Sequence, residues 1–389
     1  MPAEVISLGC RLNLSESEQL RGLLAQESDV VVINSCAVTA EAVRQTRQAI
    51  RRARRERPAA RLLVTGCAAE VERAALSAMP EVDGLIANTA KLDPRAWNVP
   101  AKTVEVRQHT RAFIAVQNGC DHNCTFCVIP QGRGPSRSLP IADVLRSVEG
   151  HLALGSREVV LTGVDLTSWG SDLDGAPGLG ALVSAILDEF PDLGRLRLSS
   201  VDGVEIDPDL LGLIATEPRV MPHVHLSLQH GHDLMLKRMK RRHSRAQAVG
   251  LVSHLRAQRP DIALGADLIA GFPTEDEAAH QANLSIIEEL KLVHGHIFPY
   301  SPRPGTPAAR MPQVAIATIK ARAAALRSAV ASQREQWLES LIGKQLEVLA
   351  ERDGTGHAPN FARVQLPPGI QAGMLVTVTP TRIVEGLLA

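Results

Sequence analysis

The sequence predicts an α/β protein with three parts: an N-terminal parallel α/β domain over residues 1–100, a partial (β/α)6 barrel over 106–338, and a small β-barrel over 340–389. Three observations support this division. Apolar runs alternate with helical patterns along most of the chain, as they do in parallel sheets. Short β-like runs with turn signals replace them at the C-terminal end. The length of 389 residues exceeds that of a usual single domain.

The N-terminal part repeats one unit three times: an apolar strand, a turn that holds a cysteine, and a helical pattern. The strands are expected at 5–8, 30–33 and 62–64, and their cysteines are Cys10, Cys36 and Cys67. Helices are expected from about Ser15, Ala40 and Glu70, the first with a Ser15-x-x-Glu18 capping box. Carboxyl ends of parallel strands meet at one edge of a sheet, so the cysteines are predicted to share a site. Three separately buried thiols are the alternative.

A linker that contains Pro94 and Pro100 precedes the second series of strands and helices. Its strands are expected at 113–117, 159–162, 196–199, 224–228, 263–269 and 296–298. Helical patterns separate them, and a Thr274-x-x-Glu277 capping box is expected to open one of these helices. Six such units indicate a partial (β/α) barrel, whose ligands bind at the carboxyl ends of the strands.

The C-terminal part follows a long helical stretch from about residue 314 to 341. Short β-like runs are expected at 345–350, 361–365 and 375–378. Asp353-Gly354 and Pro367-Pro368-Gly369 supply turn signals between them. Short strands with such turns are typical of a small β-barrel.

Composition limits the class of protein. The formal net charge is zero, so whole-chain charge gives no support for a nucleic-acid partner. The N-terminus lacks a basic region followed by an apolar stretch, and no run is long enough to span a bilayer. We therefore expect a cytoplasmic protein with no membrane partner. Six cysteines in a long chain without a secretion signal favour metal or redox chemistry over three disulfides.

The remaining cysteines form the sharpest motif, Cys120-x3-Cys124-x2-Cys127, directly after the first barrel strand. Three thiolates on one loop can hold three irons of a [4Fe–4S] cluster and leave the fourth iron open to an exchangeable ligand. Structural zinc requires four ligands, and His122 is the nearby candidate for the fourth. Its position inside the tight triplet makes that arrangement awkward.

This motif resembles the radical S-adenosylmethionine enzymes, and the resemblance extends over most of residues 108–335. It implies that the open iron binds S-adenosylmethionine and that the reduced cluster cleaves it to a 5′-deoxyadenosyl radical. The resemblance also implies a cofactor contact for Phe126, with core packing as the alternative, and one for Gly163, with a plain turn glycine as the alternative. Ser227, Gln229 and Asp267 lie at later strand ends and are candidates for contacts with ribose or substrate.

The N-terminal segments narrow the resemblance to the methylthiotransferases. The matching stretches are Ser7-Leu-Gly-Cys-Arg-Leu-Asn13, Val32-Ile-Asn-Ser-Cys-Ala-Val-Thr39, Val64-Thr-Gly-Cys-Ala-Ala-Glu70 and Gln117-Asn-Gly-Cys120. The resemblance implies a second [4Fe–4S] cluster, involved in sulfur delivery, on Cys10, Cys36 and Cys67. All six cysteines are then metal ligands, and the cofactors are two [4Fe–4S] clusters and S-adenosylmethionine.

Within that family, Arg133-Gly-Pro-Ser-Arg-Ser138 is similar to the branch that acts on N6-threonylcarbamoyladenosine in tRNA. The isopentenyladenosine branch has Arg-Gly-Arg-Glu-Arg-Ser there. The resemblance implies insertion of sulfur at carbon 2 of the adenine at position 37, followed by methylation. The alternatives are a methylthiotransferase for isopentenyladenosine or a ribosomal protein, and, from another class, a non-catalytic iron–sulfur or zinc RNA-binding protein.

The implied reaction also needs an electron donor and a sulfur source, and the sequence identifies neither. A tRNA partner predicts basic residues on the surface. Four arginines share one face of the second helix: Arg44, Arg47, Arg51 and Arg54. A second cluster comprises Lys237, Arg238, Lys240, Arg241, Arg242 and Arg245, where phosphate contact is expected. The C-terminal part resembles the RNA-binding TRAM domain, yet its charges balance. Its Phe361 is a candidate for base stacking or, alternatively, for core packing.

Overall fold

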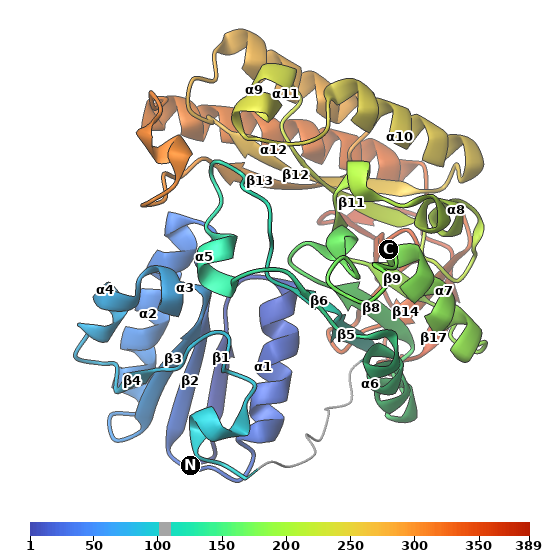
Figure 1. Cartoon of the computed structure of the whole chain (residues 1–389). Helices are drawn as coiled ribbons and strands as arrows, with labels where there is room; N and C mark the ends of the chain where they lie inside the picture. The colour runs from blue at the N-terminus through green and yellow to red at the C-terminus, as the bar shows by residue number, and fades with distance from the viewer. Residues whose placement is uncertain (101–109) are drawn as a thin grey trace.

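The computed structural model describes residues 1–100 and 110–389, so the predicted start of the barrel at residue 106 lies outside the described residues. In Figure 1 the N-terminal sheet and its helices lie beside a curved series of parallel strands, and the C-terminal strands pack against that series. The arrangement is an α/β fold, as the alternation of apolar and helical patterns predicts.

Four parallel strands in the order β1-β2-β3-β4 form the N-terminal sheet. They are β1 (Glu4–Ser7), β2 (Val30–Ser35), β3 (Arg61–Gly66) and β4 (Gly84–Leu85). Alternate side chains of the buried strands enter different cores: Val32 packs with Leu20 of the first helix, whereas Ile33 packs with Ile50 of the second. Strand β4 was not predicted, because two residues give no periodic pattern.

The helices of this region are α1 (Arg11–Leu23), α2 (Ala40–Glu56), α3 (Cys67–Val71) and α4 (Arg73–Ser77). The predicted start of α2 is confirmed, with the Thr39 hydroxyl accepting from the Ala42 amide. The predicted capping box at Ser15 is wrong. Ser15 lies inside α1, where its hydroxyl donates to the Phe113 carbonyl at 2.8 Å, and Cys10 occupies the N-cap position. The third helix begins at Cys67 rather than near Glu70.

The barrel region contains a parallel series of strands in two sheets, β5-β8-β9 and β10-β11-β12-β13. The strands are β5 (Arg111–Ala115), β8 (Glu158–Thr162), β9 (Leu196–Leu198), β10 (Ser200–Val201), β11 (His223–Gln229), β12 (Ala263–Ala270) and β13 (His294–Pro299). The predicted third strand divides at Ser199, so that β9 pairs with β8 and β10 pairs with β11. In Figure 1 the open side of the curved series faces the N-terminal sheet.

Helices cover the outside of this series. They are α6 (Ile141–Ala153), α7 (Leu179–Glu189), α8 (Pro208–Thr216), α9 (Asp233–Arg238), α10 (Arg245–Gln258), α11 (Glu277–Glu289) and α12 (Ile316–Glu339). The predicted Thr274 cap of α11 is wrong. Asp276 caps the helix by accepting from the Ala279 amide at 2.8 Å, because its carboxylate directly precedes the first turn. Thr274 lies outside the helix with a φ of 68°.

The C-terminal sheet has the order β17-β14-β15-β16-β19-β18. Its strands are β14 (Leu346–Ala350), β15 (Thr355–His357), β16 (Arg363–Gln365), β17 (Leu375–Val378), β18 (Ile383–Val384) and β19 (Leu387–Leu388). Phe361 was predicted to begin a strand, but it lies in the preceding turn with a φ of 69°. This sheet packs on the barrel through buried arginines: Arg195 donates to the His357 carbonyl and Arg197 to the Pro359 carbonyl.

Among the described residues, no helix combines the length and apolar character that a membrane crossing requires.

Two cysteine triplets and the cavities beside them

The cysteine loop of the barrel region connects the short strand β6 (Gln117–Asn118) to the helix α5 (Ile129–Arg133). Its thiols, on Cys120, Cys124 and Cys127, line a single cavity of about 170 Å³, here called the cluster cavity. The loop is fixed from outside: the Thr125 amide donates to the Met239 carbonyl at 3.1 Å, and its carbonyl accepts from the Ala308 amide at 2.9 Å. These bonds hold the three thiols on one side of the loop.

Gln117 joins the cysteine loop to the turn after β8. Its side-chain amide donates to the Gly119 carbonyl at 2.9 Å, and its carbonyl oxygen accepts from the amides of Val164 and Asp165 at 3.0 and 2.9 Å. A Cβ at Gly163 would lie 2.9 Å from the same oxygen, so only glycine fits this close approach. The position of Gly163 is therefore set by packing against Gln117.

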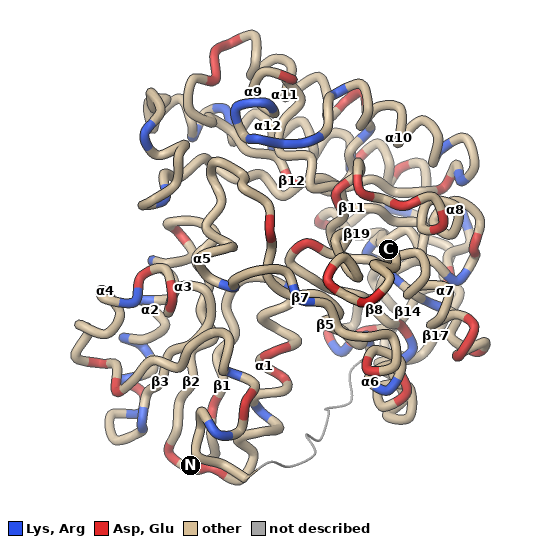
Figure 2. Tube along the Cα trace, in the orientation of Figure 1, with Lys and Arg blue, Asp and Glu red and all other residues tan. Residues whose placement is uncertain are grey.

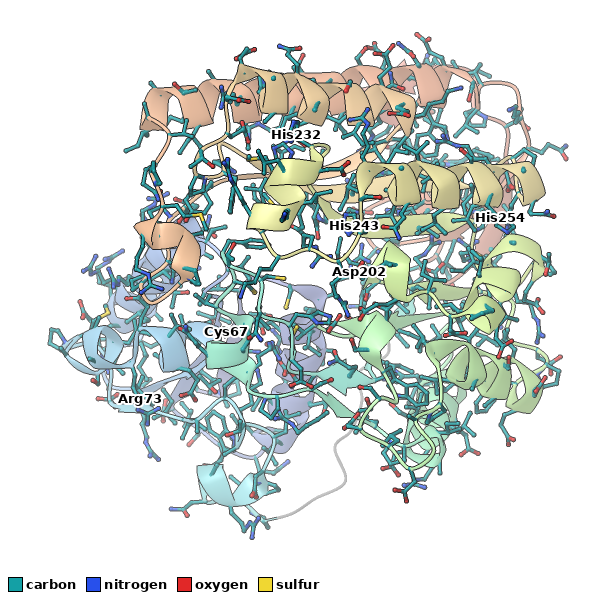
Figure 3. All side chains as sticks on the ribbon, turned by 45° about the horizontal axis from the view of Figure 1, so that its top comes forward. Cys67, Arg73, Asp202, His232, His243 and His254 are labelled. Carbon is teal, nitrogen blue, oxygen red and sulfur yellow. The ribbon has the colours of Figure 1, made fainter. Side chains whose placement is uncertain are left out.

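Charged side chains surround the cluster cavity. Arg241 is buried and bonds to the Asp202 carboxylate at 2.6 Å, the Ser227 carbonyl at 2.8 Å and the Cys124 sulfur at 3.5 Å. We expected Arg241 to contact phosphate on a surface; that prediction is wrong, because the fold turns this member of the basic run inward. In Figure 3, Asp202 lies toward the middle of the molecule beside His243.

His122 faces carboxylates. Its Nε2 lies 2.9 Å from Asp165 and 3.5 Å from Glu205. Its hydrogen bonds to these two groups raise the pKa of His122 to about 10. Cys120, His122 and Asp165 place possible ligand atoms within 4.8 Å of one another, so a mixed metal site is geometrically open. Such a site would leave Cys124 and Cys127 unused, whereas an iron–sulfur cluster uses all three thiols of the loop.

The five predicted cofactor contacts divide between two cavities. Phe126, Ser227 and Gln229 line the cluster cavity with the cysteines. Phe126 also packs edge to face on Phe272, with ring centroids 6.4 Å apart, so its core packing is observed and its contact with a cofactor stays a prediction. Gly163 lines a second cavity, of about 590 Å³, here called the central cavity. Asp267 lines both.

The N-terminal cysteines lie at corresponding places on neighbouring units: Cys10 before α1, Cys36 after β2 and Cys67 at the start of α3. Burial raises the pKa of the Cys36 thiol to about 11, and the nearby Cys10 and Cys67 thiols raise it further. Burial raises the pKa of Cys67 as well, and Cys10 contributes to the increase. Each thiol is near enough to the others to affect its titration, and Cys10 and Cys36 line one cavity, which agrees with the convergence of parallel strand ends.

The surroundings of this triplet fit a bulky metal cluster. A Cβ at Gly9 would lie 2.7 Å from the Cys36 sulfur, and a Cβ at Gly132 would lie 3.1 Å from the Cys67 Cβ. Backbone therefore approaches the thiols where any side chain would clash. All six cysteines are free, so each thiol can serve as a metal ligand.

The two triplets are neighbours across the boundary between the N-terminal sheet and the barrel. Burial raises the pKa of Cys127 to about 12, and both Cys124 and Cys67 contribute. Asn88 donates to the Gly132 carbonyl at 2.5 Å, which ties the N-terminal region to α5. Figure 3 shows Cys67 near α5, in the middle of the molecule. A cluster on each triplet would thus lie close to the other.

Behind the N-terminal triplet lies a buried charge triad. Glu16 accepts from Lys91 at 2.6 Å and from Arg133 at 2.9 Å. Arg133 also donates to the Asn13 side chain at 2.5 Å. Two cations share one carboxylate, so the triad carries a surplus positive charge. The Cys67 thiolate is among the groups that raise the pKa of Arg133, which places this charge beside the cysteines.

The central cavity lies between the two regions. Cys10 and Cys36 line it from the N-terminal side, and histidines of β11 and β13 line it from the barrel. Asp267, on β12 between them, is bonded through one oxygen to His225 and His296, each at 3.0 Å. Ser200 and Asp267 belong to the walls of both cavities, so the cluster and central cavities are adjacent.

Arg11 also lines the central cavity, next to Cys10 in sequence. Among the described residues it makes no hydrogen bond or ion pair, and its guanidinium lies 5.6 Å from the centre of the Phe361 ring. Burial lowers the pKa of Arg11 to about 10, with Arg111 and Arg197 adding to the decrease. Phe361 lines the same cavity and stacks on His357, so it packs between regions, and stacking on a base stays a prediction.

The predicted basic surfaces are largely paired. On α2, the four arginines bond to acidic neighbours: Arg44 to Glu41, Arg47 to Glu72, Arg51 to Glu81 and Arg54 to Asp83. In the second cluster Arg242 pairs with Glu205 and Arg245 with Glu289. Figure 2 shows this second cluster as a run of positive charge after α9. Among the described residues, Lys237, Arg238 and Lys240 have no carboxylate partner, and Arg238 donates to the Thr274 hydroxyl instead.

Sequence reasoning missed the groups that hold the site together. Gln117 was noted only as part of a motif, and Asp165, Lys91 and Glu16 were not singled out. A carboxylate directly after a barrel strand is a usable signal for Asp165. Lys91 and Glu16 give no local signal, because their pairing joins segments 75 residues apart.

Comparison with known proteins agrees with this geometry. Residues 3–87 match the family described as Uncharacterized protein family UPF0004, and residues 114–283 match the Radical SAM superfamily. A solved structure of the radical S-adenosylmethionine methyltransferase TsrM from Kitasatospora setae aligns with a TM-score of 0.57 at 16% identity, covering 79% of this chain and 77% of that one. This likeness establishes the fold of the barrel region.

Curated relatives cover almost the whole chain. The threonylcarbamoyladenosine tRNA methylthiotransferase MtaB of Rickettsia prowazekii (strain Madrid E) is 42% identical, over 99% of this chain and 96% of its own. The tRNA-2-methylthio-N(6)-dimethylallyladenosine synthase of Paracoccus denitrificans is 32% identical, over 89% of this chain and 85% of its own. Identity of this extent over both triplets and the barrel means that the chain belongs to the radical S-adenosylmethionine family of tRNA methylthiotransferases.

Proposed function

We propose that this enzyme converts N6-threonylcarbamoyladenosine at position 37 of tRNA to its 2-methylthio derivative. One observation carries the proposal: the barrel triplet lines one cavity, Cys10 and Cys36 of the N-terminal triplet line the next, and the two cavities share Ser200 and Asp267. A relative named for this substrate is 42% identical over nearly the full length. Isopentenyladenosine in tRNA, the substrate class of the 32% relative, and a ribosomal protein are the competing substrates.

The proposal assigns one [4Fe–4S] cluster to each triplet. Cys120, Cys124 and Cys127 would hold the cluster that, when bound, supplies the electron for cleavage of S-adenosylmethionine. Cys10, Cys36 and Cys67 would hold the second cluster, associated with sulfur delivery. The predicted division at 1–100, 106–338 and 340–389 then separates an auxiliary-cluster part, a catalytic part and an RNA-binding part.

The residues of the cluster cavity have positioning roles in this proposal. Phe126, Ser227 and Gln229 lie where S-adenosylmethionine would occupy the space beside the loop. Gln117 keeps the turn at Gly163 against the loop, so the cavity retains its shape when a ligand leaves. Arg241 donates hydrogen bonds to Asp202 and to the Ser227 carbonyl. These bonds would keep water away from that wall of the cluster cavity.

The adenine would enter the central cavity, because that space meets the cluster cavity at Ser200 and Asp267 and meets Cys10 and Cys36 on its other side. Carbon 2 of the base could then face both the radical source and the sulfur source. A radical route is required, since the C–H bond at carbon 2 is neither acidic nor electrophilic. The tRNA anticodon loop is the proposed partner; the electron donor and the sulfur source remain to be identified by reconstitution.

The test uses anaerobically reconstituted enzyme and anticodon stem-loop RNAs that carry threonylcarbamoyladenosine, isopentenyladenosine or unmodified adenosine at position 37. We expect mass spectrometry of the nucleosides to find a methylthio product from the first RNA. The wild type should bind about eight irons and a Cys10/Cys36/Cys67→Ala variant about four, as two [4Fe–4S] clusters require. Product only from the isopentenyl RNA, or equal iron in both proteins, would contradict the proposal.

A further inference from the structure

The central cavity has an unusual balance of charge. Among the described residues that line it, Arg11 is the only lysine or arginine and Asp267 the only acid. The Asp267 carboxylate is already bonded to two histidines, His225 and His296, at 3.0 Å each. Asp267 is therefore not the counter-ion of Arg11, and the cavity contains one uncompensated permanent cation.

The neighbouring arginines do not share this condition. Arg111 is 2.5 Å from Glu351, and Arg197 is 2.9 Å from Glu158. Both raise the positive potential around Arg11 while having carboxylate partners of their own. Among the described residues, the close partner of Arg11 is the Phe361 ring at 5.6 Å, and the carboxylate that acts on it, Glu158, is already paired with Arg197. A half-buried guanidinium that has no close carboxylate among the described residues, beside two other cations, is a favourable site for an anion from outside the chain.

A second observation points to a ligand in the same space. His223 lines the central cavity, is only 4% exposed, and has no hydrogen-bond partner on either ring nitrogen. Buried imidazole nitrogens are normally bonded, so this ring lacks a partner that the described residues do not supply. Burial keeps the pKa of His223 well below its usual range, and its neutral ring can donate one hydrogen bond and accept another.

We propose that Arg11 binds the carboxylate of the N6-threonylcarbamoyl group and thereby selects this substrate over isopentenyladenosine. This inference rests on the proposed function. The threonylcarbamoyl group ends in an amino acid, with a carboxylate and a hydroxyl, whereas the isopentenyl group is wholly apolar. A guanidinium binds a carboxylate through two parallel hydrogen bonds. An isopentenyl group in the same cavity would leave the cation both desolvated and unpaired, which is a strong basis for discrimination.

The test measures binding to the reconstituted holoenzyme. The probes are two anticodon stem-loop RNAs: one carries N6-threonylcarbamoyladenosine, and the other carries the methyl ester of its carboxylate. We expect wild-type enzyme to bind the carboxylate RNA about 10- to 100-fold more tightly than the ester, the range for hydrogen bonds to a charged group. Arg11→Gln should bind the two RNAs equally, and Arg11→Lys should retain part of the preference.

Arg44→Gln is the matched control, because Arg44 is an arginine of the same N-terminal region that pairs with Glu41 on the exposed face of α2. It should retain the wild-type preference. Iron content and S-adenosylmethionine cleavage are measured for each variant, since Arg11 is adjacent to Cys10. If Arg11→Gln does not assemble its clusters, the affinities of the wild type for the acid and the ester still test whether the carboxylate is recognised.

Equal binding of acid and ester by the wild type overturns the inference, as does an unchanged preference in Arg11→Gln. Failure of the proposed function looks different. In that case the wild type forms no methylthio product from the threonylcarbamoyl RNA but does so from the isopentenyl RNA. If the threonylcarbamoyl product forms without any dependence on the carboxylate, the function stands and the role of Arg11 is lost.

Discussion

The two cysteine triplets each present three thiols, but in different electrostatic surroundings. The N-terminal triplet comes from three separate strand ends and lies beside a buried triad in which Lys91 and Arg133 exceed Glu16 by one positive charge. The barrel triplet lies on one loop among ions that pair with each other: Arg241 with Asp202, and Arg242 with Glu205. Identical ligands therefore do not imply identical clusters.

This contrast would suit the two iron–sulfur sites with different tasks that we propose. A surplus of positive charge favours thiolates and an anionic cluster, because unscreened charges in a dry region interact strongly. The barrel loop lacks such a surplus, and its paired ions shape the cavity instead. The first environment stabilises a charged group, and the second leaves room for a charged ligand.

The largest expected effect comes from removing one thiol of each triplet. Cys124→Ala should reduce reductive cleavage of S-adenosylmethionine by at least about 1000-fold, a loss of roughly 4 kcal/mol of transition-state stabilisation. Cys36→Ala should retain cleavage and lose the methylthio product. The measurement is 5′-deoxyadenosine formation alongside nucleoside analysis. Loss of cleavage in both variants would mean that the triplets do not act separately.

The charge triad gives the next largest effect. Glu16→Gln leaves Lys91 and Arg133 buried without a counter-ion, so we expect destabilisation of about 3–5 kcal/mol, as for other broken buried pairs. Urea unfolding of cluster-free protein under reducing conditions measures the change. Glu41→Gln is the control, because it breaks an exposed pair with Arg44 and should leave stability unchanged. An unchanged free energy of unfolding for Glu16→Gln would contradict the electrostatic difference between the two triplets.

The same triad predicts a pH dependence. Lys91 and Arg133 hold the pKa of Glu16 below its ordinary value despite burial, which acts in the other direction. A carboxyl with a lowered folded pKa contributes stability that is present above its unfolded pKa and is lost as pH falls through the folded value. Wild-type stability should therefore decline below about pH 4.5 more steeply than that of Glu16→Gln. Parallel pH profiles in thermal unfolding would contradict this assignment.

The smallest effects concern the surfaces of the two regions. Lys237→Gln and Lys240→Gln should each reduce the salt dependence of tRNA binding by about one phosphate contact, with a few-fold loss of affinity. Arg47→Gln should change neither, because Arg47 already pairs with Glu72. Filter binding at several salt concentrations checks both results. A larger loss for Arg47→Gln would place the RNA on α2 instead.

Much of this architecture could be predicted from local patterns. Strand positions followed from apolar runs, and the convergence of Cys10, Cys36 and Cys67 followed from parallel topology. Local patterns failed where the fold overrides them. The Ser15 capping box looked complete, yet α1 begins at Arg11 and uses Ser15 to contact Phe113. Helix starts depend on where the preceding strand ends as well as on capping residues.

Charged residues were the hardest to place, because sequence gives the charge and not its partner. Arg241 sits in a run of basic residues that is typical of a surface, but Asp202, 39 residues away, holds it inside. The arginine face of α2 was correctly placed on one side of the helix, and three of its four acidic partners, Glu72, Glu81 and Asp83, come from distant segments. Pairing across the chain is a property of tertiary structure.

Phe361 has a consequence for experiments with shortened proteins. This ring comes from the C-terminal sheet, yet it lines the central cavity and lies 4.9 Å from the ring of His223 and 4.8 Å from the Arg197 guanidinium. The proposed RNA-binding part therefore also contributes a wall of the central cavity. An enzyme truncated before residue 340 would lack this wall and would admit water to the cavity. Its loss of activity would therefore combine two effects: solvent in the cavity and weaker tRNA binding.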